Sequence, residues 1–415
     1  MINKLKSQTY DFLRRTQKYT GTDNIYLAKG GFWLTLGQII SSVAAFLLSV
    51  AFANLLDPVT YGNYKYILSI VGILGIFSLR GMGTAITQAA ARDLEGSFYT
   101  GFKTKLKWSL LGSLVAIGGA VYYWLQGNDL LPIPLLISAI FLPLMQASGV
   151  YRSFLTGKKL FNVQVKYNSI SQMISVAAMI SALFLTKNLF WLIAIYFVSH
   201  TSLNYFFYLI TQRKFQPNKK EDPQTLLYGK HLSLMSITSI VANYIDKILL
   251  FTLTESGQLA IYSFAIAIPE QIKGILKNIN VLALPKLATK SREEIKINLI
   301  KKFGKLFFLT GVIIVSYILI APYIYKMFFP RYLDSILYSQ LFILSLVALP
   351  VSLLTTAFQA KMRKKELYLF RITPFIRIVL LVILIPFYGI WGAVIAMVGA
   401  KIFSLALVLF LFRKF

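Results

Sequence analysis

The chain of 415 residues has no cysteine, only two histidines and only 15 acidic residues. The lack of cysteine excludes disulfides, thiol nucleophiles and lipid-modified cysteines. His200 and His231 do not make a usual zinc site, because there is no cysteine ligand and no HExxH spacing. There is also no P-loop, so we do not expect bound ATP as an energy source. We predict no metal site and no bound cofactor.

Apolar residues dominate what is present, since 57% of the chain is hydrophobic. Stretches of about 20 apolar residues are long enough to cross a hydrocarbon core of about 30 Å as helix, and they recur along the whole sequence. The sequence therefore predicts an all-α polytopic membrane protein with twelve transmembrane helices. The expected spans are 30–55, 64–87, 106–125, 131–150, 167–185, 189–210, 231–253, 258–284, 303–327, 335–357, 367–387 and 389–412.

The 43 lysine and arginine residues give a net charge of +28 and are concentrated in alternate connections between the expected spans. Basic residues near span ends are retained on the cytoplasmic side, so these connections and both termini are predicted to be cytoplasmic. Lys105 and Arg152 are counted with these cytoplasmic charges, whereas Lys65 is an exception assigned to the opposite side. The basic excess also indicates attraction to anionic membrane lipids and does not indicate nucleic-acid binding.

Weak internal similarity suggests that the chain is doubled. "TQRKF" at 211–215 is matched by "LFRKF" at 411–415, and six spans would return the chain to its starting side. We therefore predict two pseudo-symmetric six-helix bundles, with a transport site between them near the bilayer midplane. The predicted divisions are a basic cytoplasmic segment at 1–28, bundles at 29–211 and 229–415, and a cytoplasmic linker at 212–228. The first segment has no cleavage-site pattern and is expected to be an amphipathic surface helix or a disordered tail.

One expected span carries three formal charges in "IPEQIKGILKNI". At 100° per residue, Glu270, Lys273 and Lys277 lie on one side of the helix and form a polar stripe. Charges within a membrane are costly and usually face a bundle interior or an aqueous cavity. Pro269 and Gly274 would permit a bend nearby.

Other charges lie at similar depth in the expected spans. Together with Glu270, Lys273 and Lys277 they predict an interior with a net charge of about +4. An alternative for Lys247 and Arg377 is that their heads reach the lipid phosphates. His200 could couple transport to protons, although a hydrogen-bonded packing role is the commoner one. Besides the residues of the stripe, the charged residues at similar depth are Arg80, Asp246, Lys247, Arg377 and Lys401.

Three separated regions resemble the Wzx-type polysaccharide flippases of the multidrug/oligosaccharidyl-lipid/polysaccharide (MOP) exporter superfamily. They are "LLDPVTYGNYKYILSIVGILGIFSLRGMGTAITQAAARD", "NYIDKILLFTLTESGQLAIYSFAIAI" followed by "ALPKLA", and "IPFYGIWGAVIAMVGAKI". The resemblance covers essentially residue 29 to the end. One departure is Arg80, which stands before "GMG" where relatives often have an acidic or polar residue.

The resemblance implies two six-helix bundles around a central cationic cavity, formed mainly by the first, second, seventh and eighth helices. It implies an undecaprenyl-diphosphate-linked oligosaccharide as cargo, moved from the inner to the outer leaflet of the bacterial cytoplasmic (inner) membrane by alternating access. The expected diphosphate-binding residues are Arg80, Lys273, Lys277, Arg377 and Lys401; Asp246, Lys247, Glu270 and His200 are candidates for charge balance or for H+ or Na+ coupling. Polysaccharide polymerase or assembly proteins are candidate partners. Trp33, Tyr244, Tyr262 and Phe264 could stack on sugar rings, although packing is the commoner role of such residues.

Three other functions are compatible with parts of this pattern. A multidrug exporter of the MATE type would suit the number of helices, but such proteins usually use acidic residues that the first span lacks. A lipid II flippase would have a similar cationic cavity but usually two more helices. A membrane glycosyltransferase or polymerase would need acidic or histidine residues on large outer loops, which are short here. We therefore expect a transporter and not an enzyme.

Overall fold

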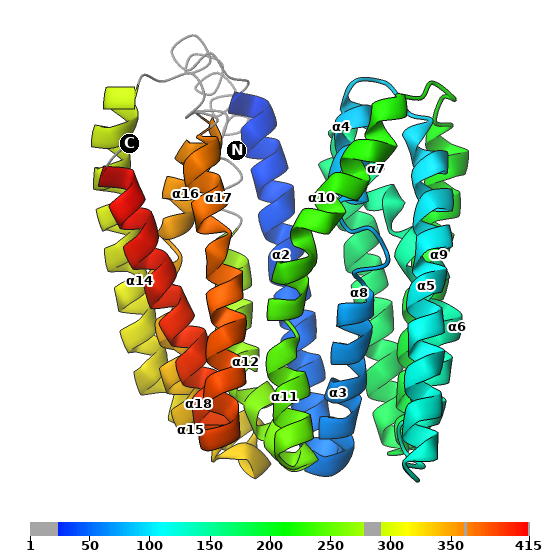
Figure 1. The fold of residues 1–415 in the computed structure, drawn as a ribbon, viewed down its shortest axis with the longest axis vertical. Helices are drawn as coiled ribbons and strands as arrows, with labels where there is room; N and C mark the ends of the chain where they lie inside the picture. Colours follow the sequence, from blue (N-terminus) through cyan, green and yellow to red (C-terminus); the bar gives the residue numbers. More distant parts are fainter. Residues whose placement is uncertain (1–23, 278–291, 361–362, 414–415) are drawn as a thin grey trace, which may run out of the picture.

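Every element of the computed structural model is helical over the residues that the structure describes, which are 24–277, 292–360 and 363–413 (Figure 1). The elements, in chain order, are α2 (Asn24–Leu55), α3 (Pro58–Leu74), α4 (Met82–Ala91), α5 (Ser97–Leu125), α6 (Pro132–Ser148), α7 (Val150–Gly157), α8 (Phe161–Leu185), α9 (Leu189–Phe215), α10 (Pro223–Ala242), α11 (Ile245–Leu253), α12 (Ser256–Lys277), α14 (Arg292–Phe328), η2 (Pro330–Tyr332), α15 (Ser335–Phe342), η3 (Ile343–Ala348), α16 (Val351–Ala360), α17 (Lys364–Phe370) and α18 (Ile372–Arg413).

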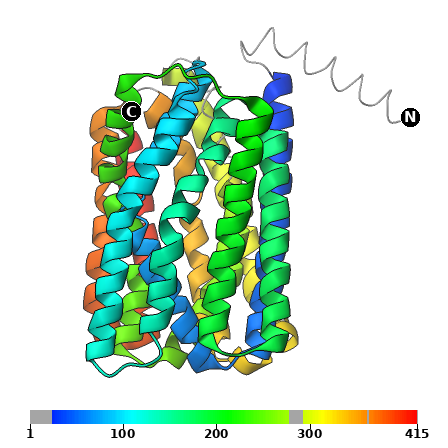
Figure 2. The same ribbon diagram turned by 90° about the vertical axis from the view of Figure 1, so that its right-hand side faces the viewer.

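The long helices run side by side along the long axis of the molecule (Figures 1 and 2). α2 begins and α18 ends at the same end, which is called the terminal face below; the other end is called the opposite face. Figure 1 shows α5, α6, α8 and α9 on one side of the view and α14, α16, α17 and α18 on the other. The segment predicted as an N-terminal surface helix or tail lies almost wholly outside the described residues.

Among the described residues, ten helical segments are long and apolar enough to cross a membrane, so the chain is a multi-pass membrane protein. Two differences separate these ten from the twelve predicted spans. The predicted span 64–87 is divided between α3 and α4. α18 is 42 residues long and contains a sharp reversal at Gly389. Gly389 has φ 51° and ψ −125° and lies three residues after Pro386. Because the chain turns at this non-helical residue, α18 contains two predicted spans, one on each side of Gly389. The number twelve stays a prediction.

The interruption between α3 and α4 corrects the expectation of one continuous helix there. Leu79 has a positive φ of 51° and the helix stops at Leu74. Gly81 then lets α10 pack against the interruption: a Cβ at this position would lie 2.4 Å from the backbone nitrogen of Ser233. The Gly81 N–H donates to Ser233 Oγ at 3.0 Å, which satisfies one backbone donor that the interrupted helix leaves free.

The hydrophobic core has a different arrangement at the two ends of the molecule. Toward the opposite face, one cluster joins residues of both halves of the chain, including Tyr61 and Phe264, whose rings stack with centroids 4.5 Å apart. Toward the terminal face, residues of each half form a cluster of their own, one around Phe98 and Phe154 and the other around Phe358 and Phe412. The two halves are therefore packed most continuously at the opposite face.

Polar contacts hold the connection between the halves against the N-terminal half at the terminal face. Lys158 Nζ lies 2.7 Å from Asp93 Oδ1 and 2.6 Å from Glu95 Oε1, and Glu95 accepts the backbone N–H of Asn218 at 2.8 Å. The neighbouring Gly96 N–H donates to the Lys220 carbonyl at 2.8 Å. α9 extends to Phe215 and α10 begins at Pro223, so both helices continue into the predicted linker 212–228 and leave a short connection.

Candidate functional site

A polar cavity of about 820 Å³ lies between the N-terminal and C-terminal parts of the chain. Its walls come from α2, α3, α8, α9, the α10–α11 junction, α11, α12 and α18. This is called the central cavity below. The charged residues that line it are Lys65, Asp246, Lys247, Glu270, Lys273 and Arg377, and His200 also lines it. Four cations against two carboxylates leave a formal excess of two positive charges, smaller than the predicted excess of about four.

The stripe on α12 is partly neutralised within its own helix. Lys273 Nζ donates to Glu270 Oε1 at 2.6 Å, one turn apart, and both side chains are about one-third exposed to the cavity. Both residues line the central cavity, as the stripe predicts. Lys277 ends α12, but its side chain lies outside the described part of the chain. The predicted role of Lys277 stays a prediction.

A second carboxylate, Asp246, is fully buried at the start of α11. Tyr262 OH donates to its Oδ2 at 2.7 Å, and Lys247 Nζ lies 3.4 Å from the same oxygen. A buried carboxylate costs free energy unless it is paired and hydrogen-bonded, and these two contacts supply both. The pair therefore offsets much of the charge of Lys247 within the cavity wall.

Arg377 of α18 contacts the junction between α10 and α11. Its Nη1 donates to Asn243 Oδ1 at 3.1 Å, whereas its Nε is buried and has no hydrogen-bond partner in the described part of the chain. The acceptor is a neutral amide, so the contact orients the guanidinium without neutralising it. Arg377 is thus less neutralised than Lys273 and Lys247.

Lys65 is a cavity residue that sequence reasoning missed, since it was assigned to an outer connection. It belongs to α3, and its Nζ lies 5.2 Å from the centre of the Tyr61 ring. Tyr61, Tyr64 and Lys65 line the cavity together because residues three and four apart share one side of a helix. That spacing is the sequence signal that could have found Lys65.

The remaining predicted site residues do not line the central cavity. Arg80 lies in the interruption between α3 and α4, is exposed, and donates through Nη2 to the Gly72 carbonyl at 3.1 Å. Its guanidinium lies 5.8 Å from the centre of the Tyr244 ring. Lys401 lies in the second part of α18. The interruption moves Arg80 from the position that a continuous helix would give it. The predicted roles of Arg80 and Lys401 stay predictions.

Of the aromatic residues predicted to stack on sugars, Tyr244 lines the central cavity. Tyr262 and Phe264 are at most 1% exposed and pack in the core toward the opposite face, while Trp33 is half-buried against Phe32 on α2. Tyr61, Tyr64 and Tyr196 line the cavity instead. The cavity thus presents phenol rings beside its charged groups.

A family model described as "Polysaccharide biosynthesis protein" matches residues 27–288 of the chain. No curated protein matches it. Three solved structures share its fold at 14% identity. The lipid II flippase MurJ in an inward closed conformation has a TM-score of 0.70 over 92% of this chain and 87% of that chain. An inward-facing MATE family transporter of the MOP superfamily has a TM-score of 0.66 over 91% and 95%. A MOP superfamily transporter from Pyrococcus furiosus, described as having a binding pocket of reverse polarity, has a TM-score of 0.63 over 94% and 96%.

Proposed function

Because the chain belongs to the polysaccharide biosynthesis protein family, we propose that it is a flippase that moves an undecaprenyl-diphosphate-linked oligosaccharide from the inner to the outer leaflet of the cytoplasmic membrane. The proposal extends to orientation, with the terminal face in the cytoplasm. It also states that the protein moves the cargo by alternating access and does not modify the cargo covalently. Polymerase or assembly proteins would receive the product.

The observation that carries the proposal is the excess of positive charge in the polar central cavity. A lipid-linked diphosphate carries about two negative charges, and transfer of such a group into low dielectric is prohibitive without partners. Lysine and arginine donors supply charge-assisted hydrogen bonds to phosphate oxygens. An organic cation would meet repulsion from the same excess, which argues against a multidrug exporter of cations.

The size of the cavity fits part of the cargo. Its volume of about 820 Å³ lies in the range of about 300 to 1,000 Å³ that is usual for ligand pockets. That range suits a diphosphate with the first sugars and leaves the lipid tail outside. Tyr61, Tyr64 and Tyr196 provide aromatic faces and hydroxyl groups for sugar rings.

Closure of one side is supported by the packing of the halves at the opposite face. A Cβ at Gly62 of α3 would lie 1.9 Å from the Ser256 carbonyl oxygen at the start of α12, so only glycine permits this approach. The Tyr66 and Phe251 rings stack with centroids 3.7 Å apart nearby. In the proposed orientation, this packing closes the cavity toward the outside.

Complementation of bacterial strains that lack defined flippases tests the function. We expect surface glycan to be restored in a strain with one particular repeat unit and not in strains with unrelated units. A strain depleted of its lipid II flippase belongs in the same set, because lipid II has the same diphosphate and the MurJ fold is similar. Rescue of that strain alone would indicate that the cargo is lipid II and not another oligosaccharide-linked lipid. Export of organic cations without any glycan rescue would reject the proposal.

A further inference from the structure

A second cavity, of about 480 Å³, lies wholly within residues 41–204. It is called the side cavity below. α2, α5, α6, α7, α8 and α9 contribute its walls, and the junction between α6 and α7 contributes Gly149. It adjoins the central cavity, because Gln172, Tyr196 and His200 line both. Its charged lining residues are two cations, Lys105 and Arg152, and no aspartate or glutamate lines it.

Lys105 is an uncompensated buried cation. Its side chain belongs to α5 and the residue is only 9% exposed. Within residues 24–277, 292–360 and 363–413, its ammonium has no carboxylate partner and no hydrogen-bond acceptor. The charges of Arg80 and Arg152 act on it and repel it. A buried ammonium without a partner is costly, so an anion that entered this cavity would remove a large unfavourable interaction.

Arg152 is held in place by neutral groups. Its Nη2 donates to Asn204 Oδ1 at 2.6 Å and its Nε to Tyr151 OH at 3.1 Å. The Tyr151 hydroxyl donates in turn to Asn168 Oδ1 at 3.2 Å, which extends the network across to α8. These contacts orient the guanidinium and leave its charge uncancelled, as a phosphate-binding arginine requires.

Both cations lie in the half of the molecule next to the terminal face. Lys105 is eight residues after Ser97, where α5 begins, which is about 12 Å along the helix. Arg152 is five residues before Gly157, where α7 ends. The sequence assigned both residues to a cytoplasmic connection because they precede or follow the apolar stretches, whereas the structure places them inside helices.

We propose that the side cavity is a diphosphate-binding subsite, in which Lys105 and Arg152 hold the phosphate groups of the lipid-linked cargo. This inference rests on the proposed function and goes beyond it by placing the anion at a first position next to the central cavity. In the central cavity, Lys273 and Lys247 already contact carboxylates. The side cavity offers two cations and no carboxylate, so neither cation has to leave an ion pair to bind a dianion there. Gln146, at the same cavity, adds an amide for a phosphate or sugar oxygen.

The test measures binding to the full-length protein in detergent micelles without anionic lipid. Inorganic pyrophosphate and geranylgeranyl diphosphate are the two probes, and geranylgeraniol is the uncharged control. Lys105→Met removes the charge and keeps the apolar stem, so it should fold at least as well as the wild type. Lys105→Arg keeps the charge. Arg152→Lys keeps the charge of the second cation and loses its planar fork.

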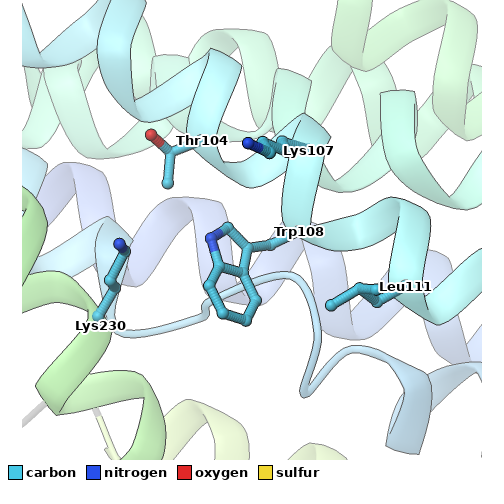
Figure 3. A pocket seen from close by; sticks show the side chains of 5 residues that line it. All are labelled: Thr104, Lys107, Trp108, Leu111 and Lys230. Carbon is cyan, nitrogen blue, oxygen red and sulfur yellow. The ribbon is translucent and has the colours of Figure 1, made fainter.

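Two surface lysines of the same helix serve as matched controls. Lys103 is exposed on α5. Lys107 lines a groove of about 450 Å³ on the outside of α5, where Lys230 of α10 lies 5.8 Å from the Trp108 ring centre (Figure 3). Lys103→Gln and Lys107→Gln change the charge of the protein as Lys105→Met does, but outside the side cavity.

We expect Lys105→Met to weaken diphosphate binding by about 10- to 100-fold, because one charge-assisted contact is lost. The two surface variants should change it by less than about twofold. If Lys105→Met loses equal affinity for both probes, the result supports a subsite that recognises the phosphate charge alone. A loss confined to the lipid probe supports the subsite with the lipid headgroup as its source.

Unchanged affinity in Lys105→Met, or an equal loss in Lys107→Gln, would overturn the subsite and leave the proposed function standing. If the wild-type protein bound neither diphosphate, the subsite and the proposed function would fail together.

Discussion

At the scale of single residues, the ion pair between Lys273 and Glu270 separates a transport role from a structural one. Replacing Lys273 alone leaves the carboxylate unpaired, whereas Glu270→Gln with Lys273→Gln removes both charges. If Lys273 contacts the diphosphate, we expect the double variant to export about as little glycan as Lys273→Gln, roughly tenfold less than the wild type. The measurement is surface glycan in the complemented strain, at matched protein abundance.

Lys273→Arg is the control for that experiment, because it keeps the charge and should keep part of the export. Wild-type export by the double variant would show that the pair only stabilises α12. The same logic applies to Lys273→Gln combined with Lys277→Gln, for which we expect normal insertion and severely reduced export.

Depth within an apolar stretch is the sequence signal for several of the predicted site residues, whose roles stay predictions. Asp246, Glu270 and Arg377 stand well inside such stretches, and the structure places all three at the central cavity. Lys105 and Arg152 could not be found in this way, because they lie where their helices extend beyond the apolar stretch. The depth of a residue within an apolar stretch identifies a charge that has apolar sequence on both sides. It does not identify a charge near the end of a long helix.

At the scale of elements, the contact between α3 and α12 at the opposite face depends on Gly62. Any larger residue places Cβ 1.9 Å from the Ser256 carbonyl oxygen, a backbone atom that cannot rotate away. We therefore expect Gly62→Val to separate the two helix ends and to expose the central cavity at that face. The chain has no cysteine, so Ser263→Cys in the cavity wall provides a single site for a membrane-impermeant maleimide in whole cells.

Gly118 of α5 is the matched control, since a Cβ there would meet nothing within 4 Å. Labelling at position 263 should rise in Gly62→Val and stay at the wild-type level in Gly118→Val. Equal labelling of all three proteins would mean that this contact does not close the cavity.

The polar contacts at the terminal face give a prediction about pH. The hydrogen bond from Lys158 lowers the pKa of Asp93, and its bonds to Asp93 and Glu95 raise the pKa of Lys158. The Asp93 contribution to stability is present above its unfolded pKa and is lost as pH falls through the lowered value. The Lys158 contribution is present below its unfolded pKa and is lost as pH rises through the raised value.

Lys158→Gln should therefore lower the melting temperature most between those two pKa values, and the difference from the wild type should shrink toward both extremes. Glu95 is only 8% exposed, so loss of its ammonium partner is the main structural cause. Thermal unfolding of the purified protein across pH measures this. Lys166→Gln, an exposed change on α8, should show no such pH-dependent difference; an identical profile for both variants would contradict the assignment.

At the scale of the whole molecule, the sequence indicated the class of fold but not its interruptions. Apolar length predicts membrane helices directly, because the bilayer sets that length. The interruption at Leu79 depends on the approach of α10 to Gly81, which joins residues about 150 positions apart. Such a contact is not visible in a window of 20 residues, and this is why Arg80 was expected on a continuous helix.

The direction of transport can be predicted from the charge of the cargo. If a group with two negative charges leaves the cell across an inside-negative potential of 100 mV, about 4 to 5 kcal/mol is released when it crosses the full field. This corresponds to an equilibrium ratio of roughly a thousand or more in favour of the outer leaflet. We therefore expect proteoliposomes with an imposed potassium-diffusion potential to accumulate a fluorescent lipid-linked diphosphate in the leaflet on the positive side. Reversing the potential should reverse the accumulation, and an uncharged lipid-linked sugar should not respond. Accumulation that did not depend on the potential but depended on a proton or sodium gradient would indicate an ion-coupled mechanism instead. Asp246 would then be the first residue to replace, because it is the fully buried carboxylate of the central cavity.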